Sequence, residues 1–95
     1  MRETIYKNAF KKQYKLMKLR GKNVSKLKDI ITMLANDLPL PYSYKDHTLT
    51  GNFSHFRKLH IEPDWLLIYS KKASKKDYPN GILYLESTGT HSDLF

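Results

Sequence analysis

Four histidines are the side chains of this sequence best suited to moving protons near neutral pH: His47, His55, His60 and His91. His47 lies in the loop before an expected strand, His60 ends that strand, and His91 follows the last strand. Because neighbouring antiparallel strands bring alternate ends together, we expect these three side chains to meet at one edge of a sheet. His55 lies five residues before His60. An odd offset places two side chains on opposite faces of a strand, so we expect His55 to be solvated and uninvolved.

Other patterns that carry chemistry are absent from the sequence. There is no cysteine, which removes disulfides, thiolate catalysis and cysteine-based zinc or iron–sulfur sites. No His-Glu-x-x-His motif, Gly-rich phosphate loop, Walker pattern or Gly-x-Ser-x-Gly elbow occurs. We therefore consider the histidines as proton donors and acceptors and expect no metal or other cofactor.

The chain is small and strongly basic. Its 95 residues are enough for one domain and one modest core. Lys and Arg number 17 against 9 Asp and Glu, a formal net charge of +8, and the lysines gather in residues 11–28 and 71–76. A small core with this excess of positive charge points to an anionic partner, and we expect some of these lysines to face phosphates.

The aromatic residues argue against disorder, because disordered chains contain few of them. Phe10, Tyr14 and Tyr69 are most simply core residues, whereas Tyr42 and Tyr44 lie in a loop, where exposed rings can stack on unpaired bases. No stretch approaches the length of an apolar membrane span and the first residues contain no apolar signal run, so we expect a cytoplasmic chain with no membrane partner.

The first half of the chain predicts a strand and two helices. Residues 3–7 are β-prone, and a helix capped by Asn8 is expected to end near Gly21. Its apolar face would contain Phe10, Tyr14 and Met17.

The second helix carries a clearer stripe, widened by Ile30: Val24, Leu27, Ile31, Leu34 and Leu38. Asn23 or Ser25 can cap its start, and Pro39 and Pro41 forbid its continuation.

The second half predicts strands. Residues 39–52 form a loop, 53–61 a strand, 65–70 an apolar central strand, 71–81 a Lys-rich excursion and 82–86 a further strand, after which 88–91 leave the sheet. The order β-α-α-β-β-β implies an α+β domain with the helical hairpin on one face of an antiparallel sheet and the other face partly open.

Several segments of the second half resemble a known family when taken together: Leu38-Pro39-Leu40-Pro41, Lys45-Asp46-His47, Leu49, Gly51, Phe56-Arg57, His60 to Tyr69, Thr88 to His91, and Leu94-Phe95. The His-x-x-Pro-Asp-x-Leu-Leu-Ile-Tyr stretch and the terminal Gly-Thr-His-x-x-Leu-Phe are specific in combination. The chain strongly resembles the YafQ branch of the RelE-type toxins of bacterial toxin–antitoxin modules. The match runs from the second helix to the last residue, and it implies that residues 1–95 are a single RelE-like toxin domain.

The resemblance implies a metal-free endoribonuclease that cleaves messenger RNA in the ribosomal A site. The RNA 2′-hydroxyl would attack its neighbouring phosphate, giving a 2′,3′-cyclic phosphate and a free 5′-hydroxyl. The implied partners are the ribosome, mRNA and a DinJ-like antitoxin, with operator DNA reached only through the antitoxin complex. The reaction needs a base, an acid and cations for the phosphate charge.

Residue by residue, the family pattern makes His91 the general acid, His60 or Asp64 the general base, and His47 the residue that positions the phosphate. Trp65 and Phe95 would shape or stack against the substrate, although Trp65 is equally well explained as core. Arg57 and Lys45 are the nearest cations in sequence.

One departure from the family pattern concerns phosphate binding. Relatives often carry an arginine four residues before the terminal histidine, and here that position is Ser87, beside Glu86. A serine cannot neutralise a pentavalent phosphate, so Arg57 or a lysine compensates or the enzyme is slow.

An alternative function is that of a protein of the same fold that binds RNA, the ribosome or only its antitoxin. A DNA-binding helix-turn-helix at Gly21 is disfavoured because the second helix uses its apolar face for the core.

Overall fold

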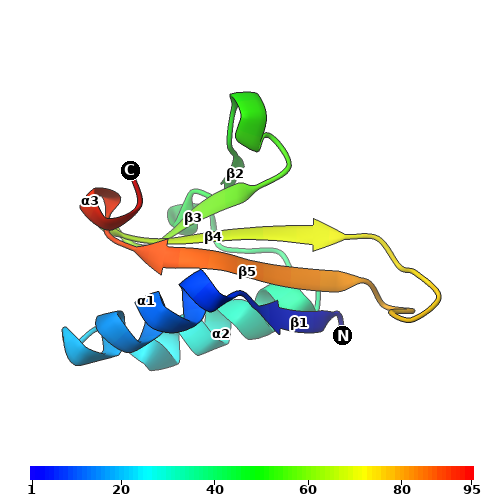
Figure 1. The fold of residues 1–95 in the computed structure, drawn as a ribbon, viewed down its shortest axis with the longest axis horizontal. Helices are drawn as coiled ribbons and strands as arrows, with labels where there is room; N and C mark the ends of the chain where they lie inside the picture. The colour runs from blue at the N-terminus through cyan, green and yellow to red at the C-terminus, as the bar shows by residue number, and fades with distance from the viewer.

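The computed structural model describes residues 1–95 and contains a five-stranded sheet with two helices on one face (Figure 1). In chain order the elements are β1 (Glu3–Tyr6), α1 (Asn8–Leu19), α2 (Val24–Ala35), β2 (His47–Thr48), β3 (Arg57–Glu62), β4 (Trp65–Lys72), β5 (Ile82–Gly89) and α3 (His91–Leu94). The strand order is β1-β5-β4-β3-β2, with β1 parallel to β5 and every other pair antiparallel. The predicted α+β class and the helical hairpin are confirmed. None of the helices combines the length and apolar character needed to cross a membrane.

The helix ends follow the backbone chemistry of their flanking residues. Gly21 has a φ of 83°, and the amide of Lys22 donates to the carbonyl of Met17, which ends α1 as predicted. The Asn23 side chain accepts from the Ser25 amide at 3.1 Å and caps α2. The proposed Asn8 cap is wrong, because α1 already includes Asn8 and its N-cap residue is Lys7, which makes no side-chain cap bond.

The α2 helix is shorter than its apolar stripe. Asp37 adopts a left-handed φ of 54° directly after the helix, and the Leu38 amide donates back to the carbonyl of Met33. Leu38 therefore lies outside the helix and is 51% exposed, so its predicted place on the buried stripe is wrong. Asp37 also binds Arg2, which precedes β1, and Lys71 of β4, so these ion pairs fasten the end of α2 to two strands of the sheet.

The core lies between the helices and the sheet. The helices contribute Phe10 and Met17 from α1 and four residues from α2: Leu27, Ile30, Leu34 and Ala35. The strands β3, β4 and β5 contribute alternate residues: Leu59, Ile61, Trp65, Leu67, Tyr69, Leu83 and Leu85. All of residues 65–70 are buried, as expected for a central strand covered on both faces.

The strand boundaries differ from the prediction at several places. Residues 53–56 are not part of β3, because a short 3-10 turn, Gly51–Phe53, carries the chain over the face of the sheet that the helices leave free (Figure 1). The chain also forms the short edge strand β2, which sequence patterns did not indicate. At the other end β4 continues to Lys72, two residues beyond the predicted strand.

The last strand is also longer than predicted, since residues 88 and 89 remain in the sheet opposite Leu67 and Leu66. Thr88 is fully buried, its hydroxyl donates to the carbonyl of Leu66 at 2.7 Å, and it accepts from the indole nitrogen of Trp65 at 3.0 Å. These bonds hold the strand in place up to Gly89. The chain then forms α3, whose start is stabilised by a capping box between Thr90 and Asp93.

Acidification is expected to loosen α3. The side-chain bond from Arg20, together with the Thr90 amide, holds the pKa of the Asp93 carboxyl far below its ordinary value of 3.8. A folded-state pKa below the unfolded value means that the stabilisation is complete above the unfolded pKa and is lost as pH falls through the folded pKa. Hydrogen exchange of residues 90–95, corrected for intrinsic rates and measured from about pH 6 to about pH 2, should lose protection at the acid end.

The Asp93→Asn variant should already show this reduced protection near neutral pH. The matched variant Asp77→Asn changes an exposed carboxyl that makes no ion pair and should behave as the wild type. Equal protection of α3 in wild type and Asp93→Asn at neutral pH would contradict this account.

Candidate active site

Three histidine rings lie side by side where β2, β3 and the start of α3 meet. The ring centroids of His47 and His60 are 6.5 Å apart, and those of His60 and His91 are 5.7 Å apart. This is the convergence expected from the strand ends. His55 lies elsewhere: it is exposed in the turn before β3, 4.2 Å from the ring of Phe56. It is not on a strand, so the face-alternation argument does not apply to it.

Each of the three rings is held through Nδ1. The Nδ1 of His47 lies 2.7 Å from the carbonyl of Lys45, that of His60 lies 3.3 Å from the carbonyl of Pro63, and that of His91 lies 2.6 Å from Oδ1 of Asp64. Carbonyl and carboxylate oxygens only accept, so Nδ1 carries the hydrogen in all three rings. Nε2 makes no hydrogen bond within the protein and is available for proton transfer.

Asp64 connects the turn between β3 and β4 to the start of α3. Its Oδ1 accepts from both the backbone amide of His91, at 3.0 Å, and the ring. The backbone bond, followed by the ring bond, lowers the pKa of the Asp64 carboxyl below its ordinary value. The carboxylate is therefore ionised at neutral pH, and its geometry orients the His91 ring.

The structure does not leave Arg57 as a free cation near the cluster. Arg57 lies on the core side of β3 with Leu59, and its guanidinium binds both carboxylate oxygens of Asp46, at 3.2 and 3.1 Å, and the Thr48 hydroxyl. Tyr69 donates to the same carboxylate at 2.6 Å. Burial, followed by the bond to Asp46, raises the pKa of the Tyr69 phenol and keeps it a donor. Arg57 thereby fastens the segment that carries His47, and its predicted role in substrate binding stays a prediction.

Two lysines, Lys45 and Lys58, lie closer to the histidines without an ion-pair partner. Lys45 is exposed and lines a shallow depression of about 320 Å³ together with His60. Lys58 shares the free face of β3 with His60, is paired with His47 across the ladder, and holds its ammonium 5.3 Å from the ring of Phe95. Sequence reasoning missed Lys58, although its two-residue spacing from His60 was the available signal.

The two aromatic residues singled out from the sequence have different places. Trp65 has 0% exposure and points into the core, so a substrate cannot stack on it and the core alternative is the right one. Phe95 is 70% exposed. Of the loop tyrosines, Tyr42 is 96% exposed, whereas Tyr44 packs against the core.

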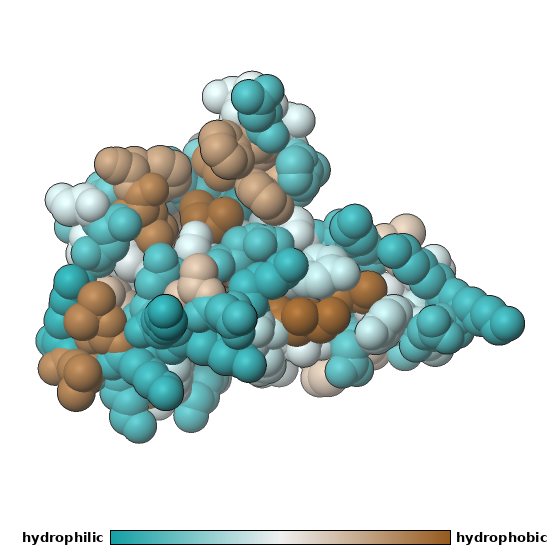
Figure 2. Space-filling view, in the orientation of Figure 1, coloured by the Kyte–Doolittle hydropathy of each residue, from teal (hydrophilic) through white to brown (hydrophobic).

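An aromatic hollow of about 250 Å³ adjoins the histidines on the free face of the sheet. It is lined by Leu49, Phe53, Phe56, Ile68, Glu86, Ser87, Leu94 and Phe95. Figure 2 shows hydrophobic surface gathered here, between the C-terminal end and the projecting segment that follows β2. Ser87 therefore forms part of this hollow.

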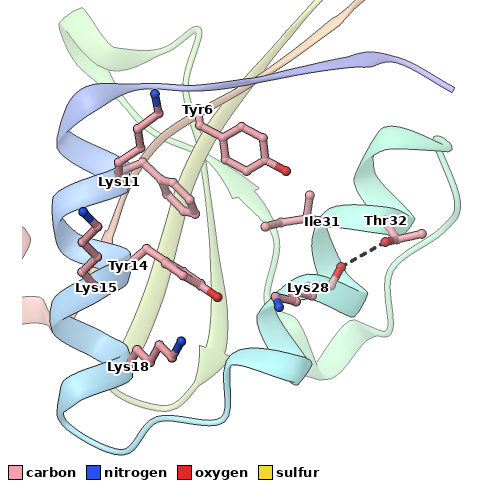
Figure 3. Close-up of a pocket in the computed structure, with 9 residues that line it drawn as sticks. Tyr6, Lys11, Tyr14, Lys15, Lys18, Lys28, Ile31 and Thr32 are labelled. Carbon is pink, nitrogen blue, oxygen red and sulfur yellow. Dashed lines mark hydrogen bonds between the residues drawn. The ribbon is translucent and has the colours of Figure 1, made fainter.

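A larger groove of about 640 Å³ lies between α1 and α2 and contains none of the histidines. Four lysines line it together with apolar and tyrosine side chains: Lys11, Lys15, Lys18 and Lys28. Figure 3 shows Tyr14 and Lys18 of α1 pointing toward Lys28 and Ile31 of α2. This lysine groove suits an anionic partner with an apolar side.

Comparison with known proteins gives one consistent result. Residues 2–95 match the family model described as "Bacterial toxin of type II toxin-antitoxin system, YafQ". The chain is 44% identical over 95 residues to "mRNA interferase toxin YafQ" of Escherichia coli K12, covering 99% of this chain and 96% of the relative.

Solved structures agree with this match. The YafQ chain of the "E.coli DinJ-YafQ complex" is 42% identical with a TM-score of 0.86, covering 100% of this chain and 99% of that one. A "metal-bound toxin from Helicobacter pylori" is 35% identical with a TM-score of 0.85 and complete coverage of both chains. Sequence and fold together establish that this chain belongs to the YafQ family of toxins from bacterial type II toxin–antitoxin systems.

Proposed function

We propose that this single-domain toxin is an endoribonuclease that cleaves messenger RNA on the ribosome by metal-free acid–base chemistry. The observation that carries the proposal is the His91–Asp64 hydrogen bond of 2.6 Å, with the His60 ring beside it. This arrangement supplies two imidazoles with unused Nε2 atoms, one of them oriented by a carboxylate. The name of the Escherichia coli relative, an mRNA interferase, supports the same reaction class.

In the proposed reaction His60 Nε2 takes the proton of the RNA 2′-hydroxyl as its oxygen attacks the adjacent phosphorus. His91, protonated at Nε2, gives its proton to the departing 5′-oxygen. The bond from phosphorus to that oxygen breaks, leaving a 2′,3′-cyclic phosphate and a 5′-hydroxyl. His60 is preferred to Asp64 as the base because both hydrogen bonds to Asp64 stabilise its ionised form and weaken it as a proton acceptor.

The remaining groups would handle the phosphate. His47 is placed to position it, and Lys45 and Lys58 would supply positive charge as negative charge builds on the phosphate oxygens. Phe95, 70% exposed, would contact the substrate.

A second candidate is a protein that binds RNA, the ribosome or its antitoxin and cleaves poorly. Ser87 is the observation that favours it, because a hydroxyl stands where relatives often have a guanidinium. Glu86 beside it adds negative rather than positive charge to that place.

The proposed partner is a DinJ-like antitoxin, with operator DNA bound only through the complex. The relative's complex with DinJ supports this. The lysine groove offers charge complementarity to an acidic segment and an apolar floor for one helix face. We place part of the antitoxin there.

The function is tested by mapping RNA 5′ ends after the toxin is induced, and by incubating purified toxin with ribosome-bound and naked message, each with and without chelator. New 5′-hydroxyl ends within reading frames, produced on ribosomes and unaffected by chelator, are expected because the ribosome would align the 2′-hydroxyl. Growth arrest without new ends would favour the binding protein. The chelator must bind transition metals and leave the ribosome's Mg²⁺ in place; loss of cleavage under that condition would contradict the metal-free mechanism.

The His91→Ala variant should fold and yet cleave ribosome-bound message roughly 10²–10⁴-fold more slowly, the usual contribution of a general acid. Single-turnover cleavage and thermal melting measure the two effects separately. His55→Ala is the matched control, since His55 is exposed and lies outside the cluster. Unchanged cleavage by folded His91→Ala would remove His91 from the mechanism.

The Ser87→Arg variant should cleave faster than the wild type. A guanidinium on β5 would add the positive charge that a serine cannot supply to a pentavalent phosphate. Single-turnover rates of the two proteins on the same ribosome-bound message measure the effect, with Ser87→Gln as the uncharged control of similar length. A slower Ser87→Arg enzyme would indicate that a lysine already fills this role.

Association with the antitoxin should slow as salt rises, because a chain with a net charge of +8 steers an acidic partner electrostatically. Replacing Lys15 of the lysine groove with Glu should slow association further, whereas Lys76→Glu in the distant 71–81 excursion should have a smaller effect. Stopped-flow rates across a salt series provide the measurement. A rate independent of salt would exclude electrostatic steering.

A further inference from the structure

We propose that the aromatic hollow binds a base beside the cleaved bond and that Glu86 at its floor selects guanine. This inference rests on the proposed RNA cleavage and adds a base preference to it. It starts from an irregularity in β5. Tyr69 of β4 pairs with Leu85 and Ile68 pairs with Ser87, so Glu86 is an extra residue without a partner across the ladder.

This bulge places two consecutive side chains in one cavity. A regular strand would send Glu86 and Ser87 to opposite faces, yet both line the aromatic hollow. Bulges commonly redirect side chains near active sites. The carboxylate is thus directed to the face that carries the histidines.

The walls of the hollow suit a flat ring. Phe53 and Phe56 lie with centroids 6.2 Å apart and planes tilted by 27°, and Phe53 and Phe95 are 58% and 70% exposed. Exposed aromatic rings around a hollow are the usual platforms on which unpaired bases stack.

The hollow lies on the same face of the sheet as the candidate active site and is connected to it by neighbouring residues of the ladder. Across the sheet, Ser87 lies opposite Ile68, Ile68 opposite Lys58, and Lys58 opposite His47. Lys58 also holds its ammonium 5.3 Å from the Phe95 ring at the edge of the hollow. A nucleotide with its base in the hollow would therefore have its phosphate near Lys58 and the histidines.

Glu86 is unusual among the carboxylates of this chain. It is half-buried, its Oε2 accepts from the Ser70 hydroxyl at 3.1 Å, and no Lys, Arg or His nitrogen lies within 4.0 Å of it. A partly buried carboxylate without a cation is costly, and donors from a ligand would offset that cost. A ligand with hydrogen-bond donors would therefore be favoured beside this carboxylate.

The chemistry of a carboxylate decides among the bases. A carboxylate only accepts hydrogen bonds. Guanine alone presents two adjacent donors, N1–H and the 2-amino group, on its Watson–Crick edge. Adenine and cytosine place a ring-nitrogen acceptor next to their amino group, and uracil places carbonyls on both sides of its N–H. Only guanine can therefore form two hydrogen bonds with Glu86 without facing a repelling acceptor.

The test compares wild type with Glu86→Gln on ribosome-bound messages that carry each of the four bases, in turn, on either side of the cleaved bond. Wild type should cleave roughly tenfold to a hundredfold faster when guanine occupies one of these two positions. The glutamine amide donates as well as accepts, so it can pair with any base edge that places a donor beside an acceptor, and the variant should lose the guanine preference. Glu3→Gln, at the opposite edge of the sheet, is the matched control and should keep the wild-type preference.

A binding measurement separates this inference from the proposed cleavage. Short RNAs with 2′-O-methyl groups cannot be cleaved, and their affinities report the base preference alone. Tighter binding of guanine that Glu86→Gln abolishes would support the site even if no cleavage were seen. Cleavage by wild type without a guanine preference would overturn the inference and leave the proposed function standing, and tightest binding of another base would also overturn it.

Discussion

The burial of β4 on both faces is the constraint on which the rest of the structure depends. Residues 65–70 are all buried, so one face of this strand must be covered by α1 and α2 and the other by the segment after β2 and the C-terminal residues. The hydrogen bond from Trp65 to Thr88 then fixes the last residues of β5 against the start of β4. Without that cover the strand would expose its apolar side chains, and the segments that provide it also carry the candidate site.

The three histidine rings of the candidate site are oriented by the segments that surround the sheet. Each ring comes from a different chain segment. Two rings are oriented by main-chain carbonyls, those of Lys45 and Pro63, and the third by the Asp64 carboxylate. The ion pair between Arg57 and Asp46, supported by Tyr69, connects the first of these segments to the core. The rings are therefore positioned by main-chain geometry and by exposed or half-buried polar contacts.

Much of the fold could be predicted from local patterns, because apolar runs and helical periods reflect burial directly. The helical hairpin, the central strand and the meeting of His47, His60 and His91 followed from such patterns. The errors have physical causes that local patterns do not contain. Thr88 stays in the sheet through a hydrogen bond to a residue far away in the sequence. The bulge at Glu86 depends on the register with a neighbouring strand, which no local pattern specifies.

The parallel pairing of β1 with β5 has a consequence for how the molecule forms. Glu3 lies opposite Ile82, so the first strand finds its place only when nearly the whole chain is available. Closing so long a loop is entropically costly and is typical of slowly folding topologies. His91 comes later still in the sequence. A chain still being synthesised therefore lacks both the completed sheet and His91 until these residues have been made, and the cell that makes the protein meets an assembled site only after that point.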